Sequence, residues 1–411
     1  MENIYDIRKQ KRLQFALSAE HSSYVLNEEQ MQSTAVVANL YYTEKAEYYS
    51  QYLNGLPKNI VLYIFSSKED TLEEVRKYVS HEKTVYLKKE NRGRDLSALL
   101  VAFRPYADQY NLICFVHDKK ERAPWLKADV DKWNENLWGN MIASSHYIYN
   151  VLQLFEKRPE LGMLFPPEPI GEIRMAWFKA SWYDNFNNCL ELAEKMHLKA
   201  DIRKEKPPIA LGSVFWARKE VLMKLLNMEW QYKDFPEEPM PEDYTISHAI
   251  ERIIGYLAQD AGYDAGTVMT EEYASWLLLY LQDYVRLMFS QVSNQIGVEN
   301  FNQLRLLNMQ EKNILRYIES HDAFFLYGAG KQGMILLKLL RERNIEPAGF
   351  LVSDGNKNRE VIEGIKVYEL KDIDPKGMGI ILTVYYHLQK EMIRELEKHG
   401  IDDFFLVFDD K

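Results

Sequence analysis

The amino-acid sequence predicts an α/β protein with a large, mostly parallel sheet in its N-terminal part and a smaller strand–helix unit at its C-terminus. From residue 33 onward, short apolar and β-branched segments alternate with helical segments, as is typical of parallel strands covered on both faces by helices. A second strand–helix unit begins at Phe324, after a stretch with helical spacing. At one domain per ~150 residues, the 411 residues leave room for two to three domains.

The predicted elements define four regions. Residues 1–32 are expected to form a helical or irregular extension. Residues 33–270 are expected to form the sheet domain, with strands at 35–42, 59–65, 84–87 and 111–116, and with helices at 44–53 and 71–79. The stretch 162–169 is expected to be a strand that runs into a proline-rich end. Residues 271–320 predict a helical connector, because apolar residues such as Leu277, Leu281 and Tyr284 recur at helical spacing. Residues 321–411 are expected to form a Rossmann-like domain.

Composition narrows the classes of function. The 51 basic and 61 acidic residues give a net charge of −10, which argues against a general nucleic-acid binder. Two cysteines, Cys114 and Cys189, cannot build a disulfide framework or a cysteine-rich zinc site. The most apolar stretch, 274–289, is interrupted by charged residues and is shorter than the ~20 residues that span a membrane. We therefore expect a cytoplasmic protein, at most peripheral at the inner face of the membrane.

A glycine-centred loop, Asn91-Arg92-Gly93-Arg94-Asp95, follows the third predicted strand. Gly93 permits a tight turn, and Asp95 is placed to cap the helix that begins after it. Amide groups at a helix N-terminus and two guanidinium groups are well suited to bind phosphate. A capped loop with solvated arginines explains the same residues equally well.

His117-Asp118-Lys119-Lys120 follows the fourth predicted strand, and ligands of such sheets bind at the carboxyl ends of strands. Enzymes that use nucleotide-sugars often hold a divalent metal here with a DxD motif, but no second carboxylate follows Asp118. The ammonium groups of Lys119 and Lys120 are able to neutralise a diphosphate instead. A charged surface loop is the alternative.

The third candidate combines Gly212 to Arg218 (GSVFWAR) with the segment from Glu242 to Arg252. Asp243 stands just ahead of a predicted helix, where it is placed to act as a general base. His248 and Arg252 share one face of that helix because they are four residues apart. A buried carboxylate beside cations is also a common structural network, so these residues alone leave both interpretations open.

Near the C-terminus, Gly328, Gly330 and Gly333 form a GxGxxG pattern between an apolar strand and an apolar helix. The next strand ends at Asp354, a position that can bind a ribose hydroxyl. These features predict a Rossmann-like unit whose ligand, a nucleotide, NAD or none, is left open. An NAD-dependent redox enzyme acting on a sugar carbon is the least favoured of the hypotheses.

Five motifs, in order, carry a resemblance to a known family. They are NRGRD (91–95), FVHDKK (115–120), PELGMLFPP (159–167), GSVFWAR (212–218) and EDYTISHAIER (242–252). Through them, residues 33–275 resemble the rhamnan synthesis F family of bacterial polysaccharide assembly proteins, and the motif order is similar to that of GT-A type glycosyltransferases. The resemblance implies a GT-A-like sheet domain and a glycosyltransferase with dTDP-L-rhamnose as donor.

The resemblance also implies roles for individual residues. The donor nucleotide and diphosphate would be held by Asn91, Arg92, Arg94, Asp95, His117, Lys119 and Lys120. The expected sugar or acceptor pocket comprises Trp216, Arg218, His248 and Arg252. The expected catalytic carboxylates are Asp243 and Glu242, which look more like the Glu-Asp pair of inverting GT-A enzymes than the family's usual Asp-Gly-Thr. Asp118 stands where the family usually has Thr, so a weak Mg²⁺ or Mn²⁺ site stays open there.

The C-terminal region has a resemblance of its own. Residues 323–408 resemble small Rossmann-like modules attached to sugar-modifying enzymes, through GAGxxG at 328–333, GFxxSD at 349–354 and GIKVYEL at 364–370. This resemblance does not identify a ligand, and Gly328, Gly330, Gly333 and Asp354 are its candidate nucleotide-binding residues.

The leading hypothesis is an inverting sugar transferase with Asp243 as general base. Its expected partners are a nucleotide-sugar donor, a lipid-linked or polysaccharide acceptor and other polysaccharide-assembly proteins, with no nucleic acid and with a homodimer left open. The rival hypothesis is a non-catalytic assembly protein that binds nucleotide-sugar or glycan. The absent DxD motif favours this rival, whereas the Glu-Asp pair disfavours it.

Overall fold

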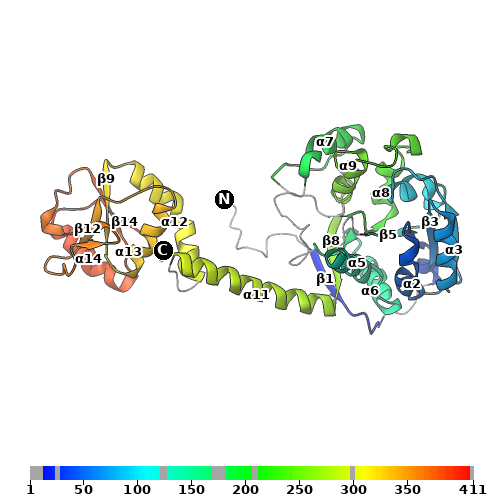
Figure 1. Cartoon of the computed structure of the whole chain (residues 1–411), viewed down its shortest axis with the longest axis horizontal. Coiled ribbons are helices and arrows are strands. Elements are labelled where there is room, and N and C mark those ends of the chain that lie inside the picture. The colour runs from blue at the N-terminus through cyan, green and yellow to red at the C-terminus, as the bar shows by residue number, and fades with distance from the viewer. Residues whose placement is uncertain are drawn as a thin grey trace. The chain divides into compact units, whose positions relative to one another are not determined.

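The computed structural model describes residues 13–23, 28–120, 127–168, 182–205, 212–241, 243–296 and 301–407 (Figure 1). The chain divides into two compact units, Met1–Tyr280 and Leu281–Lys411. The division falls within helix α11 (Glu271–Ile296), so this helix contributes to both units. The predicted α/β class with mostly parallel sheets is confirmed.

An eight-stranded sheet with the order β1-β8-β6-β7-β5-β2-β3-β4 forms the centre of the N-terminal unit. Neighbouring strands are parallel except at β7, which runs antiparallel to both β5 and β6. The strands are β1 (Leu13–Leu17), β2 (Thr34–Asn39), β3 (Val61–Ser66), β4 (Thr84–Lys88), β5 (Leu112–His117), β6 (Leu161–Phe165), β7 (Phe215–Arg218) and β8 (Asp264–Thr270).

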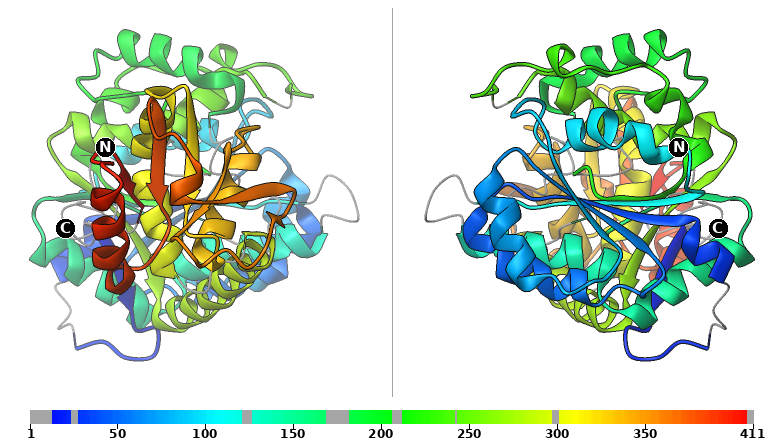
Figure 2. Two further views of the ribbon diagram at one scale, coloured as in Figure 1. Left: turned by 90° about the vertical axis from the view of Figure 1, so that its left-hand side faces the viewer. Right: turned by 90° about the vertical axis from the view of Figure 1, so that its right-hand side faces the viewer.

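Helices cover both faces of this sheet, as the right-hand view of Figure 2 shows. One face carries α2 (Ala46–Asn54), α3 (Glu69–Tyr78), α5 (Lys127–Ile142) and α6 (Ser145–Lys157). The other carries the π-helical turn η3 (Ala98–Ala102), α4 (Arg104–Ala107), α7 (Phe186–Lys195), α8 (Lys219–Leu226), α9 (Ile246–Ile253) and α10 (Tyr256–Asp260). Short helices α1 (Glu28–Gln32), η2 (Thr43–Lys45), η5 (Tyr183–Asn185) and η6 (Tyr232–Asp234) join these elements.

Alternation along the central strands explains why two cores form. In β5, Ile113 and Phe115 face one core, whereas Cys114 and Val116 face the other. Successive side chains of a strand point to opposite faces, so a strand buried on both sides is apolar throughout. The strongest sequence signal for the fold therefore comes from the strands at the middle of the sheet.

The N-terminal region departs from the sequence prediction. Residues 1–32 were expected to be helical or irregular, but Leu13–Leu17 forms strand β1, which pairs in parallel with β8 at one edge of the sheet. Leu13, Phe15 and Leu17 pack on the core at every second position. Five residues with this alternation are too few to separate an edge strand from an irregular segment in the sequence alone.

The C-terminal unit contains a six-stranded sheet with the order β11-β12-β10-β9-β13-β14, in which β11 alone pairs antiparallel. Its strands are β9 (Ala323–Tyr327), β10 (Gly349–Val352), β11 (Val361–Ile362), β12 (Ile365–Glu369), β13 (Met378–Leu382) and β14 (Phe405–Leu406). Its helices are α12 (Phe301–Glu319), α13 (Lys331–Arg341), α14 (Tyr386–Lys398) and the short η7 (Leu370–Asp372). Apolar clusters pack on both faces of the sheet.

Candidate functional site

Polar side chains from four motifs meet at one edge of the N-terminal sheet. The carboxyl ends of β2 and β5 lie side by side there, because Asn39 pairs with His117. The antiparallel strand β7 begins at the same edge, where Phe215 pairs with Phe115. The loops after β4 and before α9 complete the edge through the hydrogen bonds described below. This is where parallel α/β sheets place their ligands.

The loop after β4 has a backbone that requires glycine. Gly93 has φ +72°, and a Cβ atom there would lie 2.6 Å from Cγ of Phe235. The hydroxyl of Ser97 donates to the carbonyl of Arg92 at 2.5 Å and closes the turn. Asn91 accepts a hydrogen bond from Ser67 at its Oδ1. The loop is thus held in one shape against the segment that contains Phe235.

The two arginines of this loop bind protein groups. Arg92 donates from Nε to Phe235 O at 2.6 Å and from Nη2 to Lys233 O at 3.2 Å, and its Nη1 lies 3.4 Å from Glu237. Arg94 contacts Glu238 and donates to Met240 O. Both side chains therefore tie the loop after β4 to residues 233–240, which lead into the Asp243 segment.

Asp95 does not cap the following helix as the sequence predicted. Its Oδ2 instead lies 3.5 Å from Nε2 of His117, and its carboxylate accepts a hydrogen bond from Ser213. Burial acts to raise the pKa of Asp95, but His117, Lys119 and the hydrogen bonds outweigh it and leave the pKa below its usual range. The NRGRD, HDKK and GSVFWAR motifs thus meet at this carboxylate.

Asp118 organises the loop after β2. Its Oδ2 accepts hydrogen bonds from the backbone amides of Tyr41 at 2.7 Å and Tyr42 at 2.8 Å. Burial raises the pKa of Asp118 to about 7, against the effect of these amides. Among the residues that the structure describes, no group of three or more His, Cys, Asp or Glu side chains is arranged to hold a metal ion. A Mg²⁺ or Mn²⁺ ion held by Asp118 together with a substrate diphosphate stays a prediction.

Two lysines follow Asp118 in different surroundings. The ammonium group of Lys119 lies 4.2 Å from the centre of the Trp133 ring and acts electrostatically on both Asp95 and His117. Lys120 forms an ion pair with Glu44, whose pKa this contact lowers. Lys119 is consequently the lysine directed toward the centre of the candidate site.

Asp243 lies within a polar cluster near α9. Its Oδ1 accepts a hydrogen bond from Nδ2 of Asn185 at 2.6 Å and lies 3.6 Å from Nη2 of Arg252. Nδ1 of His248 lies 3.9 Å from the same oxygen. These three contacts involve Oδ1, and Oδ2 takes part in none of them. Glu242 lies outside the described residues.

Glu251 connects the residues around Asp95 and His117 with those around Asp243, and it was not among the residues predicted for the site. Its Oε1 accepts a hydrogen bond from the amide of Gly212 at 2.8 Å, and its Oε2 lies 3.8 Å from Arg252. Its charge acts on both His117 and His248. The available signal was its position three residues after His248, which places both on one helical face.

Two expected pocket residues lie elsewhere. Trp216 is completely buried in the core and donates from Nε1 to Met141 O at 2.9 Å. Arg218 lies at the other end of β7, beside the start of β5, where it pairs with Leu112 and donates to the carbonyls of Leu161 and Phe155. The site therefore contains neither side chain.

The C-terminal glycines have three different environments. Gly328 has φ +119°, and a Cβ atom on Gly333 would lie 2.1 Å from Gly328 O, so both positions require glycine. A Cβ atom on Gly330 would have nothing within 4 Å among the described residues. Asp354 accepts from the amide of Lys371 at Oδ1 and lies 3.1 Å from His399 at Oδ2. Gly330 thus has space for a side chain, while both oxygens of Asp354 are engaged.

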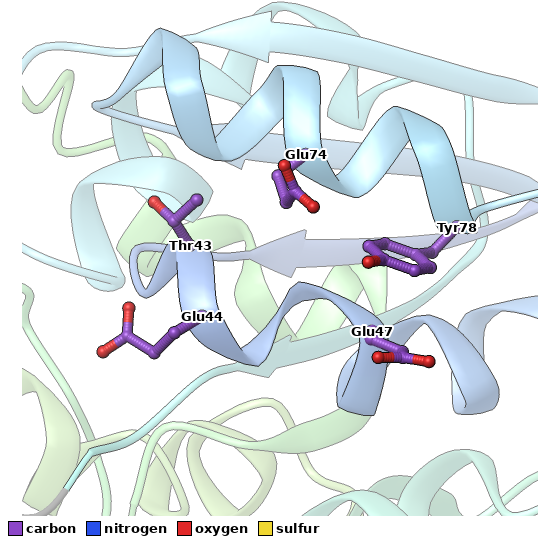
Figure 3. Close-up of a pocket in the computed structure, with 5 residues that line it drawn as sticks. All are labelled: Thr43, Glu44, Glu47, Glu74 and Tyr78. Carbon is purple, nitrogen blue, oxygen red and sulfur yellow. The ribbon is translucent and has the colours of Figure 1, made fainter.

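A hollow of about 350 Å³ lies between η2–α2 and α3, and Figure 3 shows its lining side chains. They are Thr43, Glu44, Glu47, Glu74 and Tyr78. Three carboxyl groups around this hollow would repel a diphosphate. None of the residues predicted for the site lines it.

Comparison with known proteins places these observations in a family. A model of the family described as Rhamnan synthesis protein F matches residues 1–263. Two curated relatives, both described as uncharacterized protein WxcX, come from Xanthomonas campestris pv. campestris strains B100 and ATCC 33913. Each is 27% identical over 183 residues, which is 44% of this chain and 24% of the relative. Within the described ranges, no helix combines the length and apolar character needed to cross a membrane.

Proposed function

We propose that this chain, which belongs to the rhamnan synthesis protein F family, is an inverting glycosyltransferase that transfers L-rhamnose from dTDP-L-rhamnose to a growing polysaccharide or lipid-linked saccharide. Membership of the family assigns the chain to the synthesis of rhamnan or a related polysaccharide. The chain spans about a quarter of the length of its curated relatives, 24%, so their names add no activity.

The proposed reaction uses Asp243 as general base. Its carboxylate takes the proton of an acceptor hydroxyl while that oxygen attacks the anomeric carbon of the donor sugar. The new carbon–oxygen bond forms as the bond to the diphosphate breaks, and dTDP leaves with the bonding electron pair. Base assistance of this kind is typically worth ~10²–10⁴ in rate.

One observation carries the proposal: Asp243 and the cations Arg94 and Lys119 belong to a single connected polar cluster, which lies where the parallel strands β2 and β5 have their carboxyl ends. The link runs from Asp243 through Arg252, Glu251 and Gly212, and Ser213 then contacts Asp95. Arg94 acts electrostatically on His248, on the Asp243 side of the cluster.

Charge at this edge suits the leaving group. Arg94 acts on Tyr42 as well as on His248, and Lys119 acts on Asp95 and His117. Positive groups fixed where negative charge develops stabilise the transition state without reorganisation. We assign Arg94 and Lys119 to the departing diphosphate. Arg92 is instead a positioning residue, since it donates to Phe235 O at 2.6 Å and to Lys233 O at 3.2 Å, whereas the contacts of Arg94 with Glu238 and Met240 O are 3.4 and 3.3 Å long.

A non-catalytic assembly protein is the alternative. The hydrogen bond from Asn185 and the ion pair with Arg252 would also suit a purely structural carboxylate. Under this alternative, the same edge binds nucleotide-sugar or glycan without chemistry.

Substitution of the base distinguishes the two functions. Asp243→Asn keeps the side-chain shape, and we expect it to bind dTDP-L-rhamnose normally while turnover falls ~10²–10⁴-fold. Turnover would be measured by release of dTDP with membranes as the source of acceptor, and binding by calorimetry. Asp108→Asn, on the surface beside Arg104, is the matched control. An active Asp243→Asn variant removes Asp243 from the role of base, and a wild-type chain that binds donor without turnover supports the assembly protein.

The acceptor and the location are part of the same proposal. We place the reaction at the cytoplasmic face of the membrane, where a lipid-linked acceptor and other assembly proteins would meet the site. The C-terminal unit lies outside the family match, and a nucleotide bound at Gly328–Gly333 stays a prediction.

A further inference from the structure

Two hydrogen-bond acceptors face one another inside the candidate site without a donor between them. Nε2 of His117 and Oδ2 of Asp95 are 3.5 Å apart. The side chains are 6% and 21% exposed, respectively. Within the described part of the chain, Nε2 is buried and has no hydrogen-bond partner. Buried polar atoms in native proteins are nearly always paired, so this one calls for an explanation.

The surroundings of His117 decide which nitrogen carries the proton. Nδ1 lies 3.1 Å from the carbonyl oxygen of Asp118, which can only accept, so Nδ1 is the donor. Burial lowers the pKa of His117, although Asp95 opposes this effect. In the neutral imidazole, Nε2 thus presents a lone pair toward the Asp95 carboxylate.

The neighbours of the pair indicate what kind of group belongs there. Ser213 already donates to Asp95, and Lys119 acts on both members of the pair. Glu251, on the Asp243 side of the site, also acts on His117. The His117–Asp95 pair is thus within electrostatic reach of Lys119, which is assigned to the diphosphate, and of Glu251, which belongs to the cluster that contains the base. In the proposed reaction, the donor sugar occupies that position.

We propose that the His117–Asp95 pair binds the sugar ring of the nucleotide-sugar donor by accepting hydrogen bonds from two neighbouring hydroxyl groups. This inference rests on the proposed function, and it changes the role expected from the sequence. A carboxylate and an imidazole lone pair repel a diphosphate, whereas a vicinal diol supplies one O–H to each acceptor. Specificity follows, because a sugar that lacks either hydroxyl leaves a buried acceptor unpaired.

The test compares ligands with and without the sugar. Calorimetry on the full chain would use three pairs: dTDP-L-rhamnose and dTDP, UDP-glucose and UDP, and GDP-mannose and GDP. We expect one sugar-nucleotide to bind more tightly than its diphosphate. Asp95→Asn should weaken that ligand about tenfold to hundredfold, the effect of losing a hydrogen bond to a charged group, and leave the diphosphate unchanged. Asp108→Asn, at the surface, should change neither.

A second series varies the ligand and does not depend on a folded variant. Deoxy analogues of the bound sugar-nucleotide, each lacking one ring hydroxyl, are titrated into wild-type protein. Two analogues that lack neighbouring hydroxyls should bind about tenfold to hundredfold more weakly. The Asp95→Asn variant should bind one of these two analogues as tightly as it binds the parent ligand, since the charged partner of the missing hydroxyl is already absent.

The other outcomes overturn the inference. Equal affinity of wild-type protein for all deoxy analogues shows that no hydroxyl is recognised. A sugar preference abolished by EDTA and restored by Mn²⁺ makes the pair metal ligands. Binding of diphosphates and sugar-nucleotides without preference overturns this inference alone, whereas a chain that binds none of the three sugar-nucleotides overturns the proposed function as well.

Discussion

Replacement of Arg92 tests whether this residue positions the site or binds the donor. Its Nε–Phe235 O and Nη2–Lys233 O hydrogen bonds come from a charged donor, and such bonds contribute ~1.5–3 kcal/mol each. The contact with Glu237 adds little, because that side chain is 84% exposed. From the lower value for each of two bonds, Arg92→Ala should reduce the free energy of unfolding by about 3 kcal/mol.

Arg92→Lys sharpens this test. The single ammonium group of lysine cannot donate to both carbonyls as the forked guanidinium does. Arg92→Lys should therefore lose about half as much free energy of unfolding as Arg92→Ala. Urea unfolding without ligand measures the change, and with a slope of ~2 kcal/mol per molar the alanine variant should unfold at ~1.5 M less urea. Arg76→Lys is the control, since Arg76 lies exposed over the Tyr86 ring. Unchanged midpoints in both Arg92 variants, together with weaker dTDP binding, would refute the positioning role.

Three further predictions concern Asp118, the glycines of the C-terminal turn, and Trp216. Burial raises the pKa of Asp118 to about 7, above the unfolded value of ~3.9, so its contribution to stability is present below about pH 4 and lost as pH rises through 7. The melting temperature of Asp118→Asn relative to wild type should therefore rise over this interval, and a constant difference would contradict the shift. Gly333→Ala should prevent folding of the C-terminal unit, because its Cβ atom would lie 2.1 Å from a carbonyl oxygen. Gly330→Ala should fold normally and lower the affinity for any nucleotide bound at this turn. Far-UV circular dichroism checks folding, and nucleotide titration checks affinity. Trp216→Phe should cost ~1–3 kcal/mol by leaving Met141 O unpaired, without changing donor affinity in calorimetry, and a selective loss of affinity would return Trp216 to the sugar pocket.

Much of the fold could be predicted because it depends on local patterns. Strands β2, β3 and β5 are short apolar segments between helices, and their burial on both faces leaves the same signal at nearly every position. The strand–turn–helix at Gly328–Gly333 was predictable for a similar reason, since positive φ and close packing leave glycine as the only residue that fits at two of its positions. Edge strand β1 has few neighbours and a weak pattern, and it was missed.

The candidate site depends on strand direction and on side-chain partners, and local sequence patterns reveal neither. The sequence alone determined that NRGRD and HDKK follow strands and that Asp243 precedes a helix. Alternation along β7 shows which residues are buried but not which way the strand runs. Because β7 is antiparallel, Ser213 joins the site, whereas Arg218 lies at the other end of the strand. The tertiary structure alone decided that Arg92 is engaged by carbonyls and that Asp95 faces His117, since both contacts join segments distant in the chain.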